Sequence, residues 1–216
     1  MFDALRRAMV EEQLRRRGIR DERVLRAMAT VPRHEFVSAE MQFAAYGDQP
    51  LAIGLGQTIS QPYMVAAMAA ALELEGSERV LEVGAGSGYQ AAVLALLARE
   101  VIAVEFHDAL ADAARERLAR LGYRNVRIEA GDGTLGFAAS APYDAILVTA
   151  AAPAIPPPLV EQLAENGRLV IPVGASEQQE LRRLRKRDGK ISDDVLLDCR
   201  FVPLLGRHGW KHPGEP

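Results

Sequence analysis

The N-terminal part of the chain has the hydrophobic pattern of short amphipathic helices. Apolar side chains recur at helical spacing over residues 3–17, and a glycine then supplies a stop signal. These positions are Leu5, Met9, Val10 and Leu14, and the stop is Gly18. Asp21 is a typical N-cap residue for a second short helix that ends before Pro32. Roughly the first 45 residues are therefore predicted to form a helical segment.

A different pattern begins at Arg79, where short apolar runs alternate with helical ones. The predicted strands are 79–83, 101–105, 125–132, 143–151 and 168–174, and the predicted helices are 62–74, 89–99, 109–122 and 157–167. Residues 46–61 are predicted to be a loop, and 180–203 to add two or three strands. Alternating strands and helices predict an α/β fold with a doubly wound, mostly parallel, Rossmann-like sheet.

Composition is that of an ordinary globular protein of one domain. The 216 residues are 49% hydrophobic and 25% charged, and the formal net charge is −3. A single cysteine, Cys199, excludes an internal disulfide, and the charged N-terminus lacks the apolar core of a signal peptide. We therefore expect a cytoplasmic protein without a membrane span. The net charge gives no electrostatic case for nucleic acid, and the basic run at 181–187 is interpreted as a solvated strand edge.

A glycine-rich loop follows the first strand of the alternating region. In VLEVGAGSGYQ, residues 80–90, the glycines are Gly84, Gly86 and Gly88. A dinucleotide-binding loop would carry a third small residue where Tyr89 stands. With Glu82 ahead of the glycines, the motif instead resembles the first motif of class I methyltransferases, which bind S-adenosylmethionine. A plain strand-to-helix turn is the structural alternative.

The chemistry of S-adenosylmethionine fits this loop. Glycines let the backbone, including that of Ala85, approach the methionine end of the cofactor closely, and a helix N-terminus favours its carboxylate. Glu82 could serve the cofactor ammonium directly or through water. No metal ion is required by any of these features.

Two further strand ends carry acids. Glu105 ends the second strand, where a carboxylate can accept both hydroxyls of a ribose, and a surface acid is the alternative. Asp132 could accept from the adenine amino group beside the Gly133 backbone, although Asp-Gly is also a common turn. The carboxyl ends of parallel strands meet at one sheet edge, so these positions predict one continuous cofactor site.

The polar stretch GQTISQPYM, residues 56–64, identifies the acceptor side. With YGDQPLAIGL before it, it resembles the signature of protein-L-isoaspartate O-methyltransferases. VPRHEFV at 31–37, GDG at 131–133, APYDAILVTAAAP at 141–153 and GRLVIPVG at 167–174 resemble the same family in the same order. The resemblance spans roughly residues 8–205. Ala52, where bacterial members often have proline, and the tail beyond Gly206 depart from it.

The resemblance implies methyl transfer from S-adenosylmethionine to the α-carboxylate of L-isoaspartyl residues in damaged proteins and peptides. That carboxylate is already ionised at neutral pH, so no general base is needed. The resemblance implies that Ser60 orients the carboxylate, and that Gln57, Thr58 and Ile59 shape the pocket. A hydroxyl can do this without over-stabilising the ground state, as a lysine or arginine would. Ser60 as a mere cap of the helix at Pro62 is the alternative.

The expected organisation is a helical segment and substrate loop at 1–60, a methyltransferase core at 61–206 and a loose tail at 207–216, within one structural domain. A monomer is expected. Two other functions stay open from sequence: a class I methyltransferase for another carboxylate or small-molecule acceptor, and a noncatalytic module that binds S-adenosylmethionine or peptide.

Overall fold

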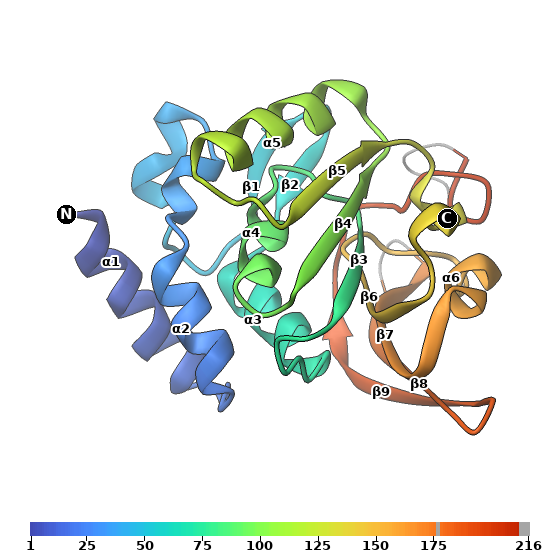
Figure 1. Cartoon of the computed structure of the whole chain (residues 1–216). Coiled ribbons are helices and arrows are strands. Elements are labelled where there is room, and N and C mark those ends of the chain that lie inside the picture. The colour runs from blue at the N-terminus through green and yellow to red at the C-terminus, as the bar shows by residue number, and fades with distance from the viewer. Residues whose placement is uncertain (176–177, 212–216) are drawn as a thin grey trace.

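The computed structural model describes residues 1–175 and 178–211 and is built around a seven-stranded sheet (Figure 1). The strand order is β5-β4-β3-β6-β7-β8-β9. Strands β3 to β7 run parallel, whereas β8 and β9 are antiparallel additions at one side. Their bounds are β3 Arg79–Val83, β4 Glu100–Glu105, β5 Val126–Ala130, β6 Tyr143–Val148, β7 Leu163–Ala175, β8 Gln178–Arg187 and β9 Lys190–Cys199. The predicted mostly parallel α/β sheet is confirmed.

Helices cover both faces of this sheet, as a doubly wound fold requires. The helices are α3 Pro62–Ala71, α4 Tyr89–Ala95, α5 Asp108–Arg120 and α6 Pro157–Glu161. Side chains alternate along a strand, so Val80 joins the hydrophobic cluster under α3, α4 and α5. Its neighbour Leu81 joins a second cluster, which includes Leu159 of α6.

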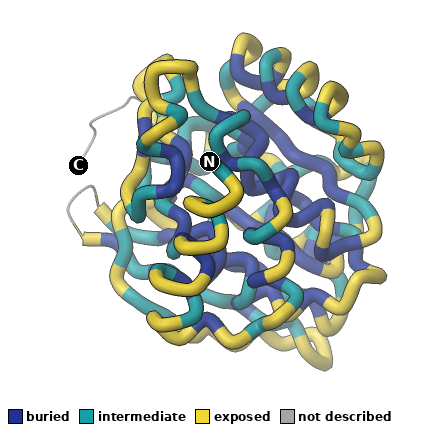
Figure 2. The backbone as a smooth tube through the Cα atoms, turned by 90° about the vertical axis from the view of Figure 1, so that its left-hand side faces the viewer, coloured by how far each residue is buried: buried dark blue, intermediate teal, exposed yellow. Residues whose placement is uncertain are grey.

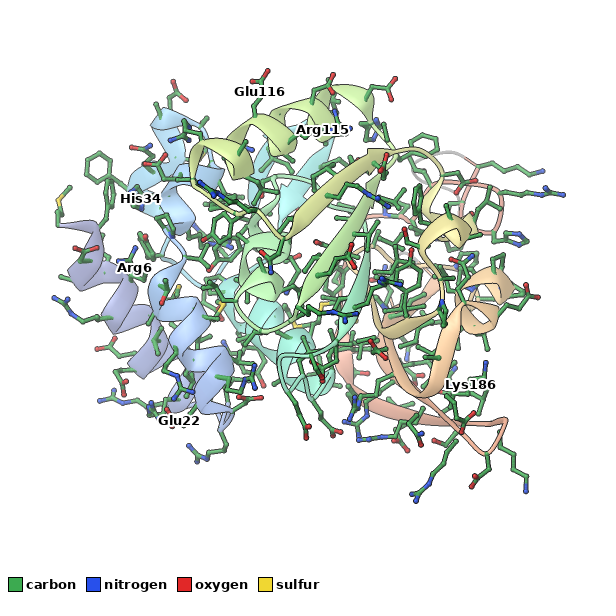
Figure 3. All side chains as sticks on the ribbon, viewed as in Figure 1. Arg6, Glu22, His34, Arg115, Glu116 and Lys186 are labelled. Atoms are coloured by element: carbon green, nitrogen blue, oxygen red, sulfur yellow. The ribbon has the colours of Figure 1, made fainter. Side chains whose placement is uncertain are left out.

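The N-terminal segment packs on the outside of the first layer of helices. It comprises α1 Phe2–Ala8, the π-helix η1 Met9–Arg15, α2 Glu22–Thr30 and the 3₁₀ helices η2 Arg33–Phe36 and η3 Ala39–Ala44. Its inner side chains, such as Leu14 and Met28, belong to the same hydrophobic cluster as Val80. Figure 2 shows this segment with exposed outer turns and a buried inner side. Charged residues such as Glu22 lie on its periphery (Figure 3).

Two predicted elements differ most from the structure, and the helix predicted over 89–99 also ends early, at Ala95. The predicted loop at 46–61 contains a hairpin of β1 Leu51–Gly54 and β2 Gln57–Ile59, whose turn is made by three residues with positive φ, Gly54, Leu55 and Gly56. The helix predicted over 157–167 ends at Glu161. It stops because the Tyr143 amide donates to the Gln162 carbonyl at 2.9 Å and Leu163 already pairs with Tyr143 in the sheet.

The C-terminal segment is not loose over its first residues. The Arg207 amide donates to Asp132 Oδ2 at 2.7 Å, and the Trp210 indole Nε1 donates to the Ala151 carbonyl at 3.0 Å. The predicted loose tail at 207–216 is therefore wrong for 207–210, while residues 212–216 lie outside the described part. Over residues 1–175 and 178–211, we find no helix with the length and apolar character needed to cross a membrane.

Candidate active site

A cavity opens at the carboxyl ends of the parallel strands. The cavity and its open mouth together contain about 780 Å³ of non-protein space, part of which is open solvent. Seven segments line it: 57–60, Val65 of α3, the glycine loop with the start of α4, 104–107 at the end of β4, Gly133, 149–150 after β6, and 202–205. The strand-end sites predicted separately from the sequence thus converge on one cavity.

The glycine loop has the backbone conformation that only glycine adopts without strain. Gly84, Gly86 and Gly88 have φ values of 93°, 53° and 86°. A Cβ at Gly84 would stand 2.7 Å from Thr149 Oγ1, and that hydroxyl donates to the Gly84 carbonyl at 2.6 Å. Gly84, Ala85 and Gly86 line the cavity, whereas Gly88 lies behind it and packs against Leu118 of α5. The loop therefore presents backbone to the cavity at close range.

Glu105 joins the glycine loop to the end of β4. Its Oε2 accepts from the Gly86 amide at 2.8 Å, and its Oε1 accepts from the His107 amide at 3.0 Å. The side chain is buried yet lines the cavity. Each carboxylate oxygen thus accepts one backbone amide and keeps lone-pair capacity for a further donor.

Glu82 does not line the cavity. It lies on the face of β3 that the helices α3 to α5 cover, it is fully buried, and neither carboxylate oxygen has a hydrogen-bond partner among the described residues. Burial, and then the nearby Glu105 carboxylate, raises the pKa of Glu82 well above its usual value. Because β3 directs the side chain towards these helices, Glu82 lies behind the cavity wall, and its predicted role towards a cofactor ammonium, directly or through water, stays a prediction.

Asp132 also lies outside the lining of the cavity, and its carboxylate is engaged by other parts of the chain. Its Oδ1 accepts from the Thr134 amide at 2.9 Å and from the Thr134 hydroxyl at 2.6 Å, while Oδ2 holds the Arg207 amide. Asp132 is not among the residues that line the cavity, and its contact with adenine stays a prediction. Gly133 does line it, and a Cβ there would stand 2.5 Å from Val83 Cγ1.

The four predicted acceptor residues lie together on the cavity wall. Gln57, Thr58, Ile59 and Ser60 all line it. The Ser60 hydroxyl has no hydrogen-bond partner among the described residues, whereas its carbonyl accepts from Arg33 Nη2 at 2.7 Å. The N-cap of α3 is Gln61, and no side chain caps this helix, so Ser60 as a helix cap is excluded.

Sequence reasoning missed several residues of this wall. Thr149 directly follows the parallel strand β6, so the rule that found Glu105 at a strand end could have found it. Residues 202–205 carry no local signal, because only the return of the chain after β9 brings them here. Within the described residues no group of three His, Cys, Asp or Glu side chains could hold a metal ion.

Comparisons with known proteins agree over almost the whole chain. Residues 5–209 match the family model "Protein-L-isoaspartate(D-aspartate) O-methyltransferase (PCMT)". A protein-L-isoaspartate O-methyltransferase of Methanoculleus marisnigri is 54% identical over 98% of this chain and 96% of its own length. That of Roseiflexus castenholzii is 56% identical over 100% of this chain and 98% of its own length.

Solved structures give the same result. A protein-L-isoaspartate O-methyltransferase superposes with a TM-score of 0.85 at 30% identity, over 94% of this chain and 67% of that one. A Plasmodium falciparum protein assigned to this activity, solved with S-adenosyl-L-homocysteine, gives 0.79 at 32% identity, over 93% of this chain and 98% of its own.

Proposed function

The chain belongs to the protein-L-isoaspartate(D-aspartate) O-methyltransferase family, and we propose that it methylates the free α-carboxylate of L-isoaspartyl residues in damaged proteins and peptides. The methyl donor is S-adenosylmethionine and the second product S-adenosylhomocysteine. One observation carries the proposal: the free Ser60 hydroxyl and the glycine loop with Glu105 face the same cavity. An acceptor bound at Ser60 and a cofactor bound at the glycine loop and Glu105 would therefore meet in this cavity.

The residues present fit S-adenosylmethionine. Gly84, Gly86 and Gly133 line the cavity without side chains, so backbone atoms face the space that a bound ligand would occupy. A Cβ at Gly84 or Gly133 would instead collide with Thr149 or Val83, so the close packing behind the wall also requires glycine there. When bound, the cofactor supplies a methyl group activated by a positively charged sulfur. We assign the backbone of Gly84, Ala85 and Gly86 to its methionine end, Gly88 to shaping that loop, Glu105 to its ribose and Gly133 to its adenine.

The acceptor side needs alignment rather than acid–base chemistry. A carboxylate is ionised at neutral pH, so the wall has only to orient one oxygen towards the methyl group. Ser60 is the residue we assign to this task, because its hydroxyl is free to donate. Gln57, Thr58 and Ile59 form the rest of the acceptor wall.

The repair itself follows without further help from the protein. In the methyl ester, the backbone nitrogen of the next residue attacks the ester carbonyl and methanol leaves, which gives a succinimide. Hydrolysis of that ring returns part of the material to normal L-aspartyl linkage, and the remainder re-enters the cycle.

The test uses labelled S-adenosylmethionine and two synthetic peptides that differ only in carrying L-isoaspartate or L-aspartate. We expect base-labile label on the isoaspartyl peptide alone. Label on another carboxylate compound but not on this peptide would indicate a different acceptor. Cofactor binding without transfer to any acceptor would instead indicate a noncatalytic binding module.

The proposal also covers the oligomeric state, the cellular location and the partners of the protein. We propose a monomer that acts in the cytoplasm on isoaspartyl proteins and peptides, without nucleic-acid or membrane partners. The net charge of −3 and the lone Cys199 support this. Residues 1–60 supply the substrate side and 61–206 the methyltransferase core of one structural domain, since one hydrophobic cluster spans both.

A further inference from the structure

Arg33, from the VPRHEFV stretch, is a fully buried cation beside the acceptor wall. Its exposed fraction is 0%, and it is among the largest fully buried side chains of the protein. Removing a charge from water is strongly unfavourable unless partners compensate for the lost hydration. A residue of this kind therefore calls for a reason beyond packing.

The guanidinium ties three segments together. Nε donates to the Ala45 carbonyl at 2.7 Å, and Nη2 donates to the Ser60 carbonyl at 2.7 Å. Its Cζ lies 4.8 Å from the centroid of the Tyr89 ring, the first residue of α4 after the glycine loop. Both Ser60 and Tyr89 line the cavity. Arg33 thus stands one layer behind the wall where we place the acceptor.

The charge of Arg33 is not neutralised by an ion pair. Over the described residues no carboxylate lies within ion-pair distance of it, and Nη1 has no hydrogen-bond partner. Asp48 is close enough to act on it, but Asp48 pairs with Arg17 and accepts from the Tyr63 amide at 2.9 Å. Burial lowers the pKa of Arg33, as expected for a cation without a direct partner.

We infer that Arg33 is a positioning residue for the acceptor carboxylate, with two effects that rest on the proposed function. Its Nη2 donor holds the Ser60 carbonyl while Nε anchors the guanidinium to Ala45, which fixes the backbone of Ser60 and so the place of the Ser60 hydroxyl. Its unpaired charge favours an anion in the adjoining cavity. Because it contacts a carbonyl and not the substrate, it attracts the carboxylate without holding the attacking oxygen.

The two effects predict different kinetic consequences. Methyl transfer turns a carboxylate and a sulfonium into neutral products, so a fixed cation stabilises the bound anion more than the transition state. Loss of the charge should therefore raise KM for the peptide. Loss of the two-carbonyl geometry should displace Ser60 and lower kcat.

Two substitutions separate these effects. Arg33→Gln removes the charge, and Arg33→Lys keeps it but loses the planar fork. We measure KM and kcat on the isoaspartyl peptide, cofactor Kd by calorimetry, and the inhibition constant of the matching isoasparaginyl peptide, whose α-carboxamide is uncharged. The wild-type protein should bind the carboxylate peptide at least about tenfold more tightly than the amide peptide.

Arg33→Gln should lose most of that preference while cofactor Kd stays within about twofold, and Arg33→Lys should keep the preference with a lower kcat. Arg23→Gln is the matched control, because Arg23 also donates to two carbonyls, those of Glu75 and Leu97, but lies away from the cavity. If Arg33 were merely structural, the preference for the carboxylate peptide over the amide peptide would be unchanged in both Arg33→Gln and Arg33→Lys.

The outcomes distinguish the inference from the proposed function. Failure of the wild-type protein to methylate the isoaspartyl peptide would defeat the function. If it methylates the peptide but binds both peptides equally, the inference alone is wrong, and this comparison needs no folded variant. A preference that survives in Arg33→Gln would also overturn it.

Discussion

Ser60 is the residue whose substitution most directly tests the acceptor wall. Ser60→Ala removes a hydroxyl that makes no hydrogen bond within the described residues, so the fold should not change. We expect kcat on isoaspartyl peptide to fall about 10- to 100-fold through lost orientation, with cofactor Kd within twofold. Ser77→Ala, at an exposed site outside the cavity, is the control. Equal activity of both variants would remove Ser60 from its positioning role.

Glu105 tests the cofactor side. Glu105→Gln removes the charge that accepts from the Gly86 and His107 amides, and replaces one acceptor oxygen by a donor. Hydrogen bonds to charged groups contribute roughly 1.5–3 kcal/mol, so cofactor Kd should rise about 10- to 100-fold by calorimetry. Glu116→Gln, on the outer side of α5 (Figure 3), should leave Kd unchanged. The ribose assignment would be wrong if the two variants bound the cofactor alike.

Glu82 makes stability depend on pH. An unfolded carboxyl group titrates near about 4.3, whereas burial raises the pKa of folded Glu82 well above that. Between these two values the folded state holds a proton that the unfolded state releases, so Glu82 lowers stability progressively as pH rises. Glu82→Gln cannot titrate. The free energy of unfolding of this variant, relative to wild type, should therefore increase from pH 5 to pH 8 in urea titrations. Parallel curves for the two proteins would contradict the buried, protonated state.

At the scale of single residues, the sequence predicts which residues lie at the strand ends better than it predicts which of their side chains face the cavity. Strand ends are predictable, and Glu105, Gly84 and Gly133 reached the cavity. Glu82 and Asp132 did not. The direction of Glu82 depends on which face of β3 packs against α3 to α5, and Asp132 is engaged by an amide from residue 207, far away in sequence. Neither fact is local.

The α2 helix offers a prediction at the scale of an element. Asp21 is its N-cap, and Oδ1 accepts from the Arg23 and Val24 amides at 2.8 and 3.2 Å. Asp21→Ala should lower the free energy of unfolding by about 1 kcal/mol, whereas Asp21→Asn keeps the acceptor and should cost less. Urea unfolding measures both. Since the cap is outside the cavity, kcat and KM should stay at wild-type values, and equal destabilisation by the two variants would argue against the cap.

Helices and strands could be predicted where the spacing of hydrophobic residues was clearly that of a helix or of a strand. The strand at 79–83 and the cap at Asp21 are confirmed, because each depends on adjacent residues. The hairpin at 51–59 was missed because its strands are short and its turn uses Leu55 in a left-handed conformation. The β7 strand begins at Leu163, inside a helical pattern, because pairing with β6 overrides local preference there.

At the scale of the whole molecule, the C-terminal segment closes one side of the site. Residues 202–205 line the cavity, and the residues that follow hold them in place. Trp210 donates its amide to the Leu204 carbonyl at 2.8 Å and its indole to Ala151, while His208 donates its amide to the buried Thr134 hydroxyl at 3.1 Å. The segment therefore joins the chain end to the ends of two parallel strands.

A chain that ends at Leu205 loses these hydrogen bonds, whereas a chain that ends at Lys211 keeps them. At roughly 0.5–1.5 kcal/mol each, their loss should lower the free energy of unfolding by about 2 kcal/mol or more. Freed residues 202–205 should also raise cofactor Kd about tenfold, because the wall must be ordered again on binding. Calorimetry and urea unfolding of the two truncated chains test this. A short chain that is destabilised but binds the cofactor normally would show that the segment serves the fold and not the cavity.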